Sequence, residues 1–502
     1  MPGFAIRPTR GRSCRSPPAS ACSTRRGSAA LSSGCSATRR ARPAPRGRPS
    51  RGRRPSADRP VGSRRRRWAT CCAVSTPDDV PPRRTGSGRR HQPPSAPRRA
   101  RAPLPTTRPA VLYAALFLEL GINLPFFPIW LQSRSIDEAM IGVILAAPLV
   151  ARIVANPLVA TLADRSGDVA RTLAVCAVAV VAGTVALALV DTAGPILLVV
   201  TITALAQGPL IALLDAYLWL HLAARHDPAA RPLVYGRIRL WGSCGFVAAT
   251  LGAGWMLDRL QASAVLWMLI GAAIATAVAA VAVAYGARAP AVPAPTAVAP
   301  AGAVAHPLRL VAVIAGVALV QASHALYYAF SSLHWRDAGW SGTLVGSLWA
   351  TAVVAEVAVF AFAGRALAVA AAPMLLLMAG AAAAVLRWLV MALDPGVGVV
   401  LLLQVTHGLT FGATHLGSMA MLARLAPAGV HARAQDWLAA AWAGAMAALT
   451  AVGGVLYASL GERAYAVMAA VAATGLVLLV SAAVADRRHS RPMPRLSLER
   501  RG

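Results

Sequence analysis

Twelve apolar stretches, each about 20 residues long, follow one another from Val111 to Ala485 with short polar segments between them. An α-helix of this length crosses the roughly 30 Å hydrocarbon core of a bilayer. Peptide groups in lipid must find hydrogen bonds within the protein, so we expect helices and not loops. The sequence therefore predicts an all-α membrane protein with helices at 111–131, 139–161, 171–190, 195–222, 236–257, 262–285, 309–332, 342–363, 372–392, 397–424, 434–458 and 464–485.

The composition excludes a single soluble globule. Apolar residues make up 57% of the chain and charged residues only 14%, whereas a soluble domain carries about 25% charged residues. The seven cysteines show no metal-ligand spacing. The chain also contains no phosphate-binding loop and no Ser/His/Asp arrangement. We therefore expect no metal, no cofactor and no enzymatic activity.

Residues 1–105 form an extension rich in arginine, proline and serine. Residues 1–110 hold 27 of the 50 basic residues and 3 of the 19 acidic residues, and every basic residue is arginine. Such a segment buries too little apolar surface to offset its ordering entropy, so we expect it to be disordered. It is either a solvated tail or lies upstream of the true start. It lacks interleaved aromatic residues, so we expect no nucleic-acid partner.

The longest polar break, at 286–308, separates six helices from six. Shifting the second half by about 200 residues places Asp215 on His415 and Gly254 on Gly454, as expected for the internal repeats of secondary transporters. The chain is therefore predicted to consist of two six-helix pseudo-repeats. The expected domains are the extension 1–105, a bundle at 106–285, a cytoplasmic linker at 286–308, a bundle at 309–485 and a cytoplasmic tail at 486–502.

Arginine is distributed unevenly between the two sets of loops. If both termini are cytoplasmic, the inner loops and the C-terminal tail carry seventeen arginines, counting Arg237 and Arg239, and the outer loops carry four. Cytoplasmic loops of membrane proteins carry the excess of positive charge. We therefore expect a multi-pass protein of a bacterial inner membrane with both termini in the cytoplasm.

Four motifs make the chain resemble the major facilitator superfamily. They are LPFFPIWL at 124–131, LADRSGD at 162–168, YGRIRLWGS at 235–243 and HGLTFGATH at 407–415. Together they are most similar to the subgroup that contains 3-phenylpropionate transporters, related to lactose permease and nucleoside/proton symporters. This resemblance implies a monomer with two six-helix bundles around a central cavity and alternating access. It also implies that Asp164, Arg165 and Arg171 form a conformational gate.

Charged and polar residues inside the predicted helices are candidates for the transport site, because charge at bilayer depth is costly and usually faces a functional interior. Helical spacing groups several of them on common faces, such as Glu119 with Asn123 and Gln207 with Asp215. For the buried carboxylates and the arginines, a structural ion pair is the alternative; for Gln207 it is a helix–helix hydrogen bond, and for Tyr328 it is plain packing. The predicted lining of a substrate cavity is Glu119, Asn123, Arg152, Gln207, Asp215, His324 and Tyr328.

The resemblance to lactose permease implies a role in proton coupling for four residues. That protein is known for an acid in helix eight, an arginine in helix nine, and a histidine and a second acid in helix ten. Here the corresponding helices carry Glu356, Arg387, His407 and His415, and the second acid is absent. We expect Arg387 to be the partner of Glu356, and Glu356 or a histidine to carry the proton.

The sequence thus predicts a proton-coupled carrier of a small organic solute. Arginine in a low-dielectric cavity pairs with carboxylates, which favours an aromatic or other organic acid. A sugar or a nucleoside is the alternative substrate, because acids outnumber arginines in the predicted cavity. A polytopic assembly factor that uses the same fold without transport is the alternative function.

Overall fold

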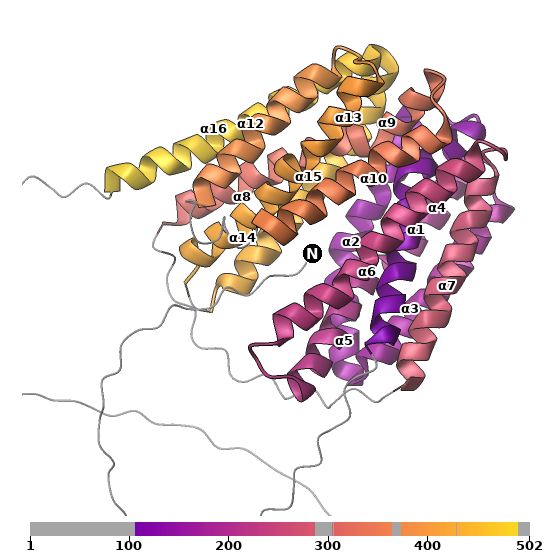
Figure 1. The fold of residues 1–502 in the computed structure, drawn as a ribbon, viewed down its shortest axis with the longest axis horizontal. Helices are drawn as coiled ribbons and strands as arrows, with labels where there is room; N and C mark the ends of the chain where they lie inside the picture. Colours follow the sequence, from indigo (N-terminus) through magenta and orange to yellow (C-terminus); the bar gives the residue numbers. More distant parts are fainter. Residues whose placement is uncertain (1–105, 287–303, 305, 364–372, 428, 490–502) are drawn as a thin grey trace, which may run out of the picture. The chain divides into compact units, whose positions relative to one another are not determined.

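The computed structural model describes residues 106–286, 304, 306–363, 373–427 and 429–489, and Figure 1 shows that helices make up nearly all of this part of the chain. The predicted N-terminal extension and most of the predicted linker and tail lie outside the described residues. Their predicted boundaries and roles stay predictions.

The first half contains seven α-helices and one short 3₁₀ helix among its described residues. They are α1 (Thr107–Ser133), α2 (Glu138–Ser166), α3 (Val169–Ala186), η1 (Leu187–Leu189), α4 (Ala193–Gln207), α5 (Leu210–Arg225), α6 (Arg231–Leu257) and α7 (Ala264–Gly286). Prolines occur inside α1 and α2. Transmembrane helices tolerate such prolines because neighbouring helices satisfy the freed backbone groups.

The second half repeats this pattern with more interruptions. Its described elements are α8 (Pro307–Ala322), α9 (Ala325–Asp337), α10 (Gly342–Ala358), η2 (Val359–Ala363), α12 (Pro373–Met391), α13 (Val397–Val405), η3 (Gly408–Ala413), α14 (Thr414–Leu425), α15 (His431–Leu460), η4 (Gly461–Ala464) and α16 (Tyr465–His489). The segments η2 and η3 are π-helical. Such turns are rare and often mark functional sites.

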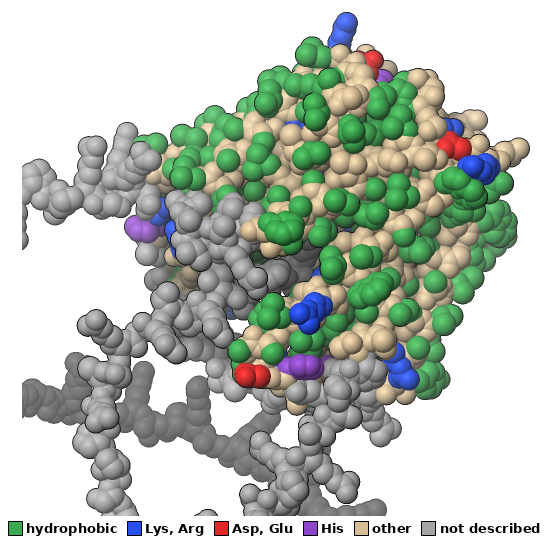
Figure 2. Space-filling model, in the orientation of Figure 1, with side chains coloured by type: hydrophobic (Ala, Val, Ile, Leu, Met, Phe, Trp, Pro, Cys, Tyr) green, Lys and Arg blue, Asp and Glu red, His purple; other side chains and the backbone are tan. Residues whose placement is uncertain are grey.

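Eleven segments of the described chain are long and apolar enough to cross a membrane. The last of them, Arg433–Ala485, has 53 residues and contains both α15 and α16. All twelve predicted spans overlap these segments, which confirms the predicted fold class. Figure 2 shows mainly hydrophobic side chains on the face in view, with most charged side chains near the helix ends.

The two halves contact each other closely through glycines at one end of the bundle. This end contains Asp258 and is named the Asp258 end; the opposite end contains Asp164 and is named the Asp164 end. A Cβ atom on Gly142 of α2 would lie 2.9 Å from the Gly454 backbone of α15. A Cβ atom on Gly254 of α6 would lie still closer, 2.2 Å from the Gly342 carbonyl oxygen of α10. All hydrogen bonds and ion pairs that join described residues of the two halves lie at the Asp258 end.

Replacing Gly254 tests this contact. Gly254→Val is expected to push the halves apart at the Asp258 end, because the new side chain meets backbone atoms that cannot rotate away. Overpacking of this kind costs about 1–3 kcal/mol. The measurement is the spin-label distance between cysteines introduced at Gln261 and Gly396, in a background without other reactive cysteines.

The matched control is Gly252→Val on the same helix. A Cβ atom there would have no neighbour within 4 Å, so the distance is expected to stay that of the parent protein. The same distance in Gly254→Val and the parent would contradict the proposed packing.

Candidate functional site

Three of the membrane-spanning segments are each broken into shorter helices, and a predicted site residue lies at each break. Gln207 is the last residue of α4, His324 lies between α8 and α9, and His407 immediately precedes η3. Pro209 follows the first interruption and cannot donate a backbone hydrogen bond. In transporters, discontinuous helices expose backbone and side-chain polar groups at the site near the membrane midplane. The local fold therefore places these polar side chains in the interior.

Glu119, Gln207 and Arg152 form a cluster that joins α1, α4 and α2. The Gln207 side-chain nitrogen donates a hydrogen bond of 2.6 Å to Glu119 Oε1, and Arg152 approaches Gln207 Oε1 at 3.5 Å. Glu119 is buried. The structure thus brings three of the predicted cavity residues together, while Asn123 stays partly exposed on α1. Because each charge in the cluster has a local partner, the cluster also fits a structural role.

Asp215 is held by two tyrosines that the sequence analysis did not select. The hydroxyl groups of Tyr113 on α1 and Tyr235 on α6 both donate to Asp215 Oδ1, the second at 2.9 Å. Asp215 is only 2% exposed. Tyr235 and Arg239 lie four residues apart and therefore share one helix face, and this spacing is a signal in the sequence that could have identified them.

Arg239 was predicted to lie in a cytoplasmic loop, and that prediction is wrong. Helix α6 begins at Arg231, so Arg239 lies more than two turns inside it. The guanidinium carbon of Arg239 lies 4.2 Å from the ring centre of Phe117 and 5.4 Å from that of Tyr113. Among the residues that the structure describes, none accepts a hydrogen bond from its guanidinium group or forms an ion pair with it. Its charge acts on two nearby carboxyl groups, those of Asp215 and Glu356.

Arg387 is occupied within its own half. It is 1% exposed, and its guanidinium group donates to the Leu403 carbonyl in the last turn of α13. It also donates to Gln404 Oε1 at 2.9 Å and to Thr406 Oγ1 at 3.2 Å. A cation near the carbonyl end of a helix is favourable. We infer that Arg387 stabilises the interruption between α13 and η3.

Glu356 does not form the expected ion pair with Arg387. Its side chain has neither a hydrogen bond nor an ion pair with any residue in the described ranges. It lies in the last turn of α10, partly exposed, against the π-helical turn η3 at Gly412. Arg239, on the other half, lies within electrostatic range of its carboxylate. The charge of Arg239 also acts on Asp215 of its own half, so the structure gives Glu356 no cationic partner in direct contact.

His324 and Tyr328 belong to an aromatic cluster in the second half. The rings of His324 and Tyr328 stack with centres 5.8 Å apart, and Trp388 meets His324 edge-on at 4.9 Å. His324 Nε2 lies 3.2 Å from Thr410 Oγ1. His324 and Tyr328, which the sequence predicts to line the cavity, therefore lie together on an apolar and mainly aromatic surface.

His407 and His415 contact different aromatic rings. His407 is buried and stacks on Phe411 with ring centres 5.4 Å apart. His415 is partly exposed and meets Phe360 edge-on at 6.2 Å. Only His407 lies beside His324, with ring centres 5.5 Å apart. The coupling roles predicted for the two histidines stay predictions.

The predicted gate residues lie at the junction of α2 and α3. Asp164 and Arg165 occupy the last turn of α2, and Arg171 the first turn of α3. The Asp168 carboxylate, and not that of Asp164, caps α3 by accepting the Arg171 backbone N–H at 3.0 Å. Asp164 and Arg171 do not form an ion pair in this structure, and their gating role stays a prediction.

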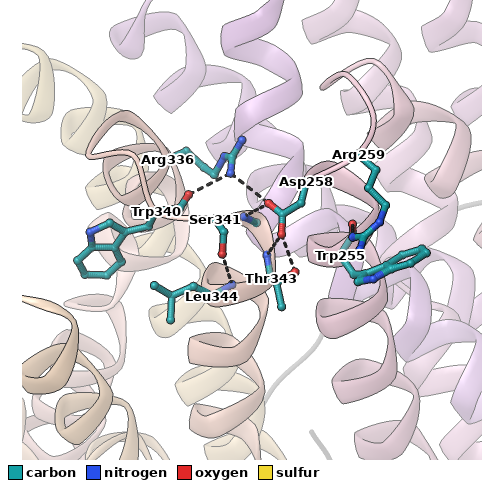
Figure 3. A network of polar contacts seen from close by, with 9 residues as sticks. Trp255, Asp258, Arg259, Arg336, Trp340, Ser341, Thr343 and Leu344 are labelled. Carbon is teal, nitrogen blue, oxygen red and sulfur yellow. Dashed lines mark hydrogen bonds and ion pairs between the residues drawn. The ribbon is translucent and has the colours of Figure 1, made fainter.

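Asp258 links the two halves and was missed in the sequence. Its carboxylate, just after α6, accepts the backbone N–H groups of Gly342 at 2.5 Å and Thr343 at 2.8 Å, which begin α10 (Figure 3). It also accepts the Thr343 hydroxyl at 2.5 Å and lies 3.5 Å from Arg336. Side chains that cap a helix of the same half are common. Here the cap comes from the opposite half, so it forms only when this end is closed.

The environment of Asp258 acts on its pKa in two directions. Burial raises the pKa of the carboxyl group, whereas the hydrogen bonds from Thr343 and Gly342 and the charge of Arg336 lower it. The net effect is a pKa below the ordinary value for aspartate. The cap is therefore fully formed above that ordinary pKa and is lost only as the pH falls through the lowered value.

His334, Asp394 and Glu462 also come together at the Asp258 end. His334 Nε2 lies 2.9 Å from Asp394 Oδ1, and His334 Nδ1 lies 2.5 Å from Glu462 Oε1. A metal ion would take one imidazole nitrogen, but here each nitrogen faces a different carboxylate. The arrangement fits an imidazole bridge between two loops better than a metal centre.

Comparison with known proteins places the chain in a family. The sequence model of the MFS_1-like family matches residues 107–467. The chain is 30% identical over 369 residues to a probable 3-phenylpropionic acid transporter of Escherichia coli K12, covering 74% of this chain and 96% of that one. It is 28% identical over 334 residues to a maltose permease of Geobacillus stearothermophilus, covering 64% and 80%.

A solved structure supports the same fold. The nucleoside transporter NupG superposes with a TM-score of 0.64 at 16% identity, covering 75% of this chain and 98% of that one. The chain therefore belongs to the MFS_1-like family of the major facilitator superfamily and is a membrane transporter of small solutes, not an enzyme.

Proposed function

We propose that the protein is a monomeric proton symporter that carries a small organic anion, with an aromatic acid favoured, by alternating access. The observation that carries this proposal is the position of Arg239. Its guanidinium group has no hydrogen-bond or ion-pair partner among the described side chains, and its charge acts on Glu356 of the other half as well as on Asp215 of its own half. A cation and a carboxylate that approach each other from two moving halves can bind an anion and a proton in turn.

The choice of an organic anion rests on which arginines are free. Arg152 lies beside Gln207 in a cluster with Glu119, and Arg387 is held by carbonyl and amide oxygens. Arg239 is left to pair with a carboxylate, an interaction suited to the planar guanidinium group. The aromatic cluster around His324 and Tyr328 offers stacking partners for an aromatic ring. The relative described as a probable 3-phenylpropionic acid transporter supports the same substrate class.

The sugar or nucleoside alternative is less well supported. Such substrates need free carboxylates that accept hydroxyl hydrogen bonds. Asp215 and Glu119 are already engaged, by Tyr113 and Tyr235 and by Gln207, which leaves Glu356 as the one acid of the predicted cavity and coupling residues without a hydrogen-bond partner in the described chain. The similarity to a maltose permease keeps a sugar as the substrate class to compare directly.

We further propose that the Asp164 end faces the cytoplasm of a bacterial cell whose inner membrane holds the protein. The excess of arginine at this end supports the orientation. The excess of arginine remains when Arg239 is counted as part of α6 and not of a loop. In this orientation the glycine contacts and the Asp258 cap close the extracellular end.

Coupling follows from competition for Arg239. An ionised Glu356 attracts Arg239 and repels a substrate carboxylate. Protonation of Glu356 removes this charge, so that Arg239 is free to bind the anion. One proton and one monovalent anion then cross together with no net charge. Release of the anion into the cytoplasm returns Arg239 to Glu356 and releases the proton.

Arg239→Gln is expected to weaken binding of 3-phenylpropionate about 10- to 100-fold, because one charge-assisted interaction is lost. The measurement is calorimetric binding to the purified protein, with uptake into vesicles as a second readout. The control is Arg237→Gln, which removes an exposed arginine two residues away on the same helix. Equal affinities for Arg239→Gln and the control would reject Arg239 as the anion site, and the same assay with maltose tests the sugar alternative.

Glu356→Gln is expected to abolish uphill uptake while sparing exchange of labelled for unlabelled substrate. Glutamine keeps the size of the side chain but cannot release a proton. Both reactions are measured in reconstituted vesicles with and without an imposed pH gradient. The matched control is Glu138→Gln at the Asp258 end of α2. Full uphill accumulation by Glu356→Gln would transfer the coupling role to Glu119, Asp215 or the histidines.

Asp258→Ala is expected to shift the protein toward a state open at the Asp258 end, because three donors lose their acceptor. The spin-label distance between Gln261 and Gly396 should lengthen in this variant. In the parent protein the same distance should stay constant from about pH 5 to pH 8, because the lowered pKa of Asp258 keeps its carboxylate ionised over this range. Asp191→Ala removes a carboxylate that pairs with Arg134 inside one half and serves as the control. If Asp258→Ala leaves the distance unchanged, the Asp258 cap does not hold this end closed.

A further inference from the structure

The side chain of Arg239 lies in a space that α1 and α6 keep open for it. Its guanidinium group lies over the rings of Phe117 and Tyr113 of α1, and Gly242 follows three residues later on α6. A Cβ atom on Gly242 would come within 2.9 Å of Arg239 Nη1 and 3.0 Å of the Phe117 ring. A side chain at this position would therefore push the guanidinium group away from the ring.

Asp215 of α5 is joined to this space through two tyrosines. Tyr113 donates to Asp215 Oδ1, which fixes the ring beside the guanidinium group, and Tyr235 donates to the same oxygen from the α6 turn before Arg239. Asp215 Oδ2 is buried and has no hydrogen-bond partner among the described residues. The charge of Arg239 acts on this carboxylate, and a buried carboxylate without such compensation is costly.

A solute can reach Arg239 but not Asp215. Arg239 is partly exposed, whereas Asp215 and the two tyrosines that bind it are buried. These residues all belong to the first half, so they move together as the two halves rock. Glu356 belongs to the second half and changes its distance from Arg239 during that movement. Asp215 therefore acts on Arg239 throughout the cycle, and Glu356 acts on it for only part of the cycle.

We propose that Asp215 is a positioning residue that sets how tightly Arg239 binds the transported anion. It holds the Tyr113 ring beside the guanidinium group and competes with the anion for the positive charge, without touching the anion. The sequence predicts Asp215 in the cavity lining; this proposal gives it a role that acts through Arg239. The inference rests on the proposed function of Arg239. A transporter gains from such a limit because an anion held by an uncompensated, half-buried arginine is released slowly.

Asp215→Asn removes the charge but keeps an oxygen that can accept from both tyrosines. We expect this variant to bind 3-phenylpropionate about tenfold more tightly, because one competing charge is lost. Exchange of labelled for unlabelled 3-phenylpropionate at saturation should slow, since release of the anion then limits the cycle. Binding is measured by calorimetry on the full chain, and exchange in reconstituted vesicles. A merely structural role would weaken binding and slow exchange together.

Two further comparisons test whether the effect passes through Arg239. In the Arg239→Gln background, Asp215→Asn should leave the affinity unchanged, because the charge on which it acts is gone. Gly242→Ala should weaken binding about tenfold by displacing the guanidinium group. Gly236→Ala is the matched control on the same helix, where a Cβ atom has no neighbour within 4 Å, and it should bind like the parent.

Three results would each overturn the inference: unchanged or weaker binding in Asp215→Asn, the same gain of affinity when Arg239 is already glutamine, or parent affinity in Gly242→Ala. A failure of the proposed function gives a different result, because the parent and Arg239→Gln would then bind 3-phenylpropionate equally. In that case Asp215 has no anion site on which to act, and the inference falls with the proposed function.

Discussion

Hydrocarbon offers a peptide group no hydrogen-bond partner, and this constraint decides where the helices of this transporter can be interrupted. Arg387 illustrates the solution. Its guanidinium group lies against the carbonyl end of α13 and also binds Gln404 and Thr406. The interruption that places His407 beside His324 thus depends on a buried cation. Arg387, for which the sequence predicts a coupling role, thus also supports the backbone at this interruption.

The same reasoning separates the arginines of the interior. Two of them are held by groups of their own half and stabilise helix packing. Arg239 lies over aromatic rings, which attract a cation without neutralising it. An aromatic face also releases its cation more readily than a carboxylate does. Arg239 therefore suits a group that must change partners during transport, and Arg387 does not.

The sequence was sufficient for the fold and insufficient for the pairing of charges. The predicted spans overlap the observed helices because length and hydropathy are local properties. The pair of Glu356 with Arg387 rested on the analogy of helix order, which does not fix which side chains face each other; the pair is absent from this structure, and the role of the two residues in coupling stays a prediction. Arg239 was counted with the cytoplasmic loops although the predicted span 236–257 contains it, because arginine near a helix end lowers the local hydropathy. Asp258 was missed because the sequence cannot show that the end of α6 meets the start of α10.

The cap formed by Asp258 has a consequence for hydration. In the closed arrangement this carboxylate saturates the exposed N–H groups at the start of α10. When the halves separate, both partners must be solvated, so opening takes up water at this end and closure releases it. The two states of the transporter then differ in bound water as well as in shape. The balance between them depends on the activity of water, which makes osmotic conditions a variable alongside substrate and proton concentration.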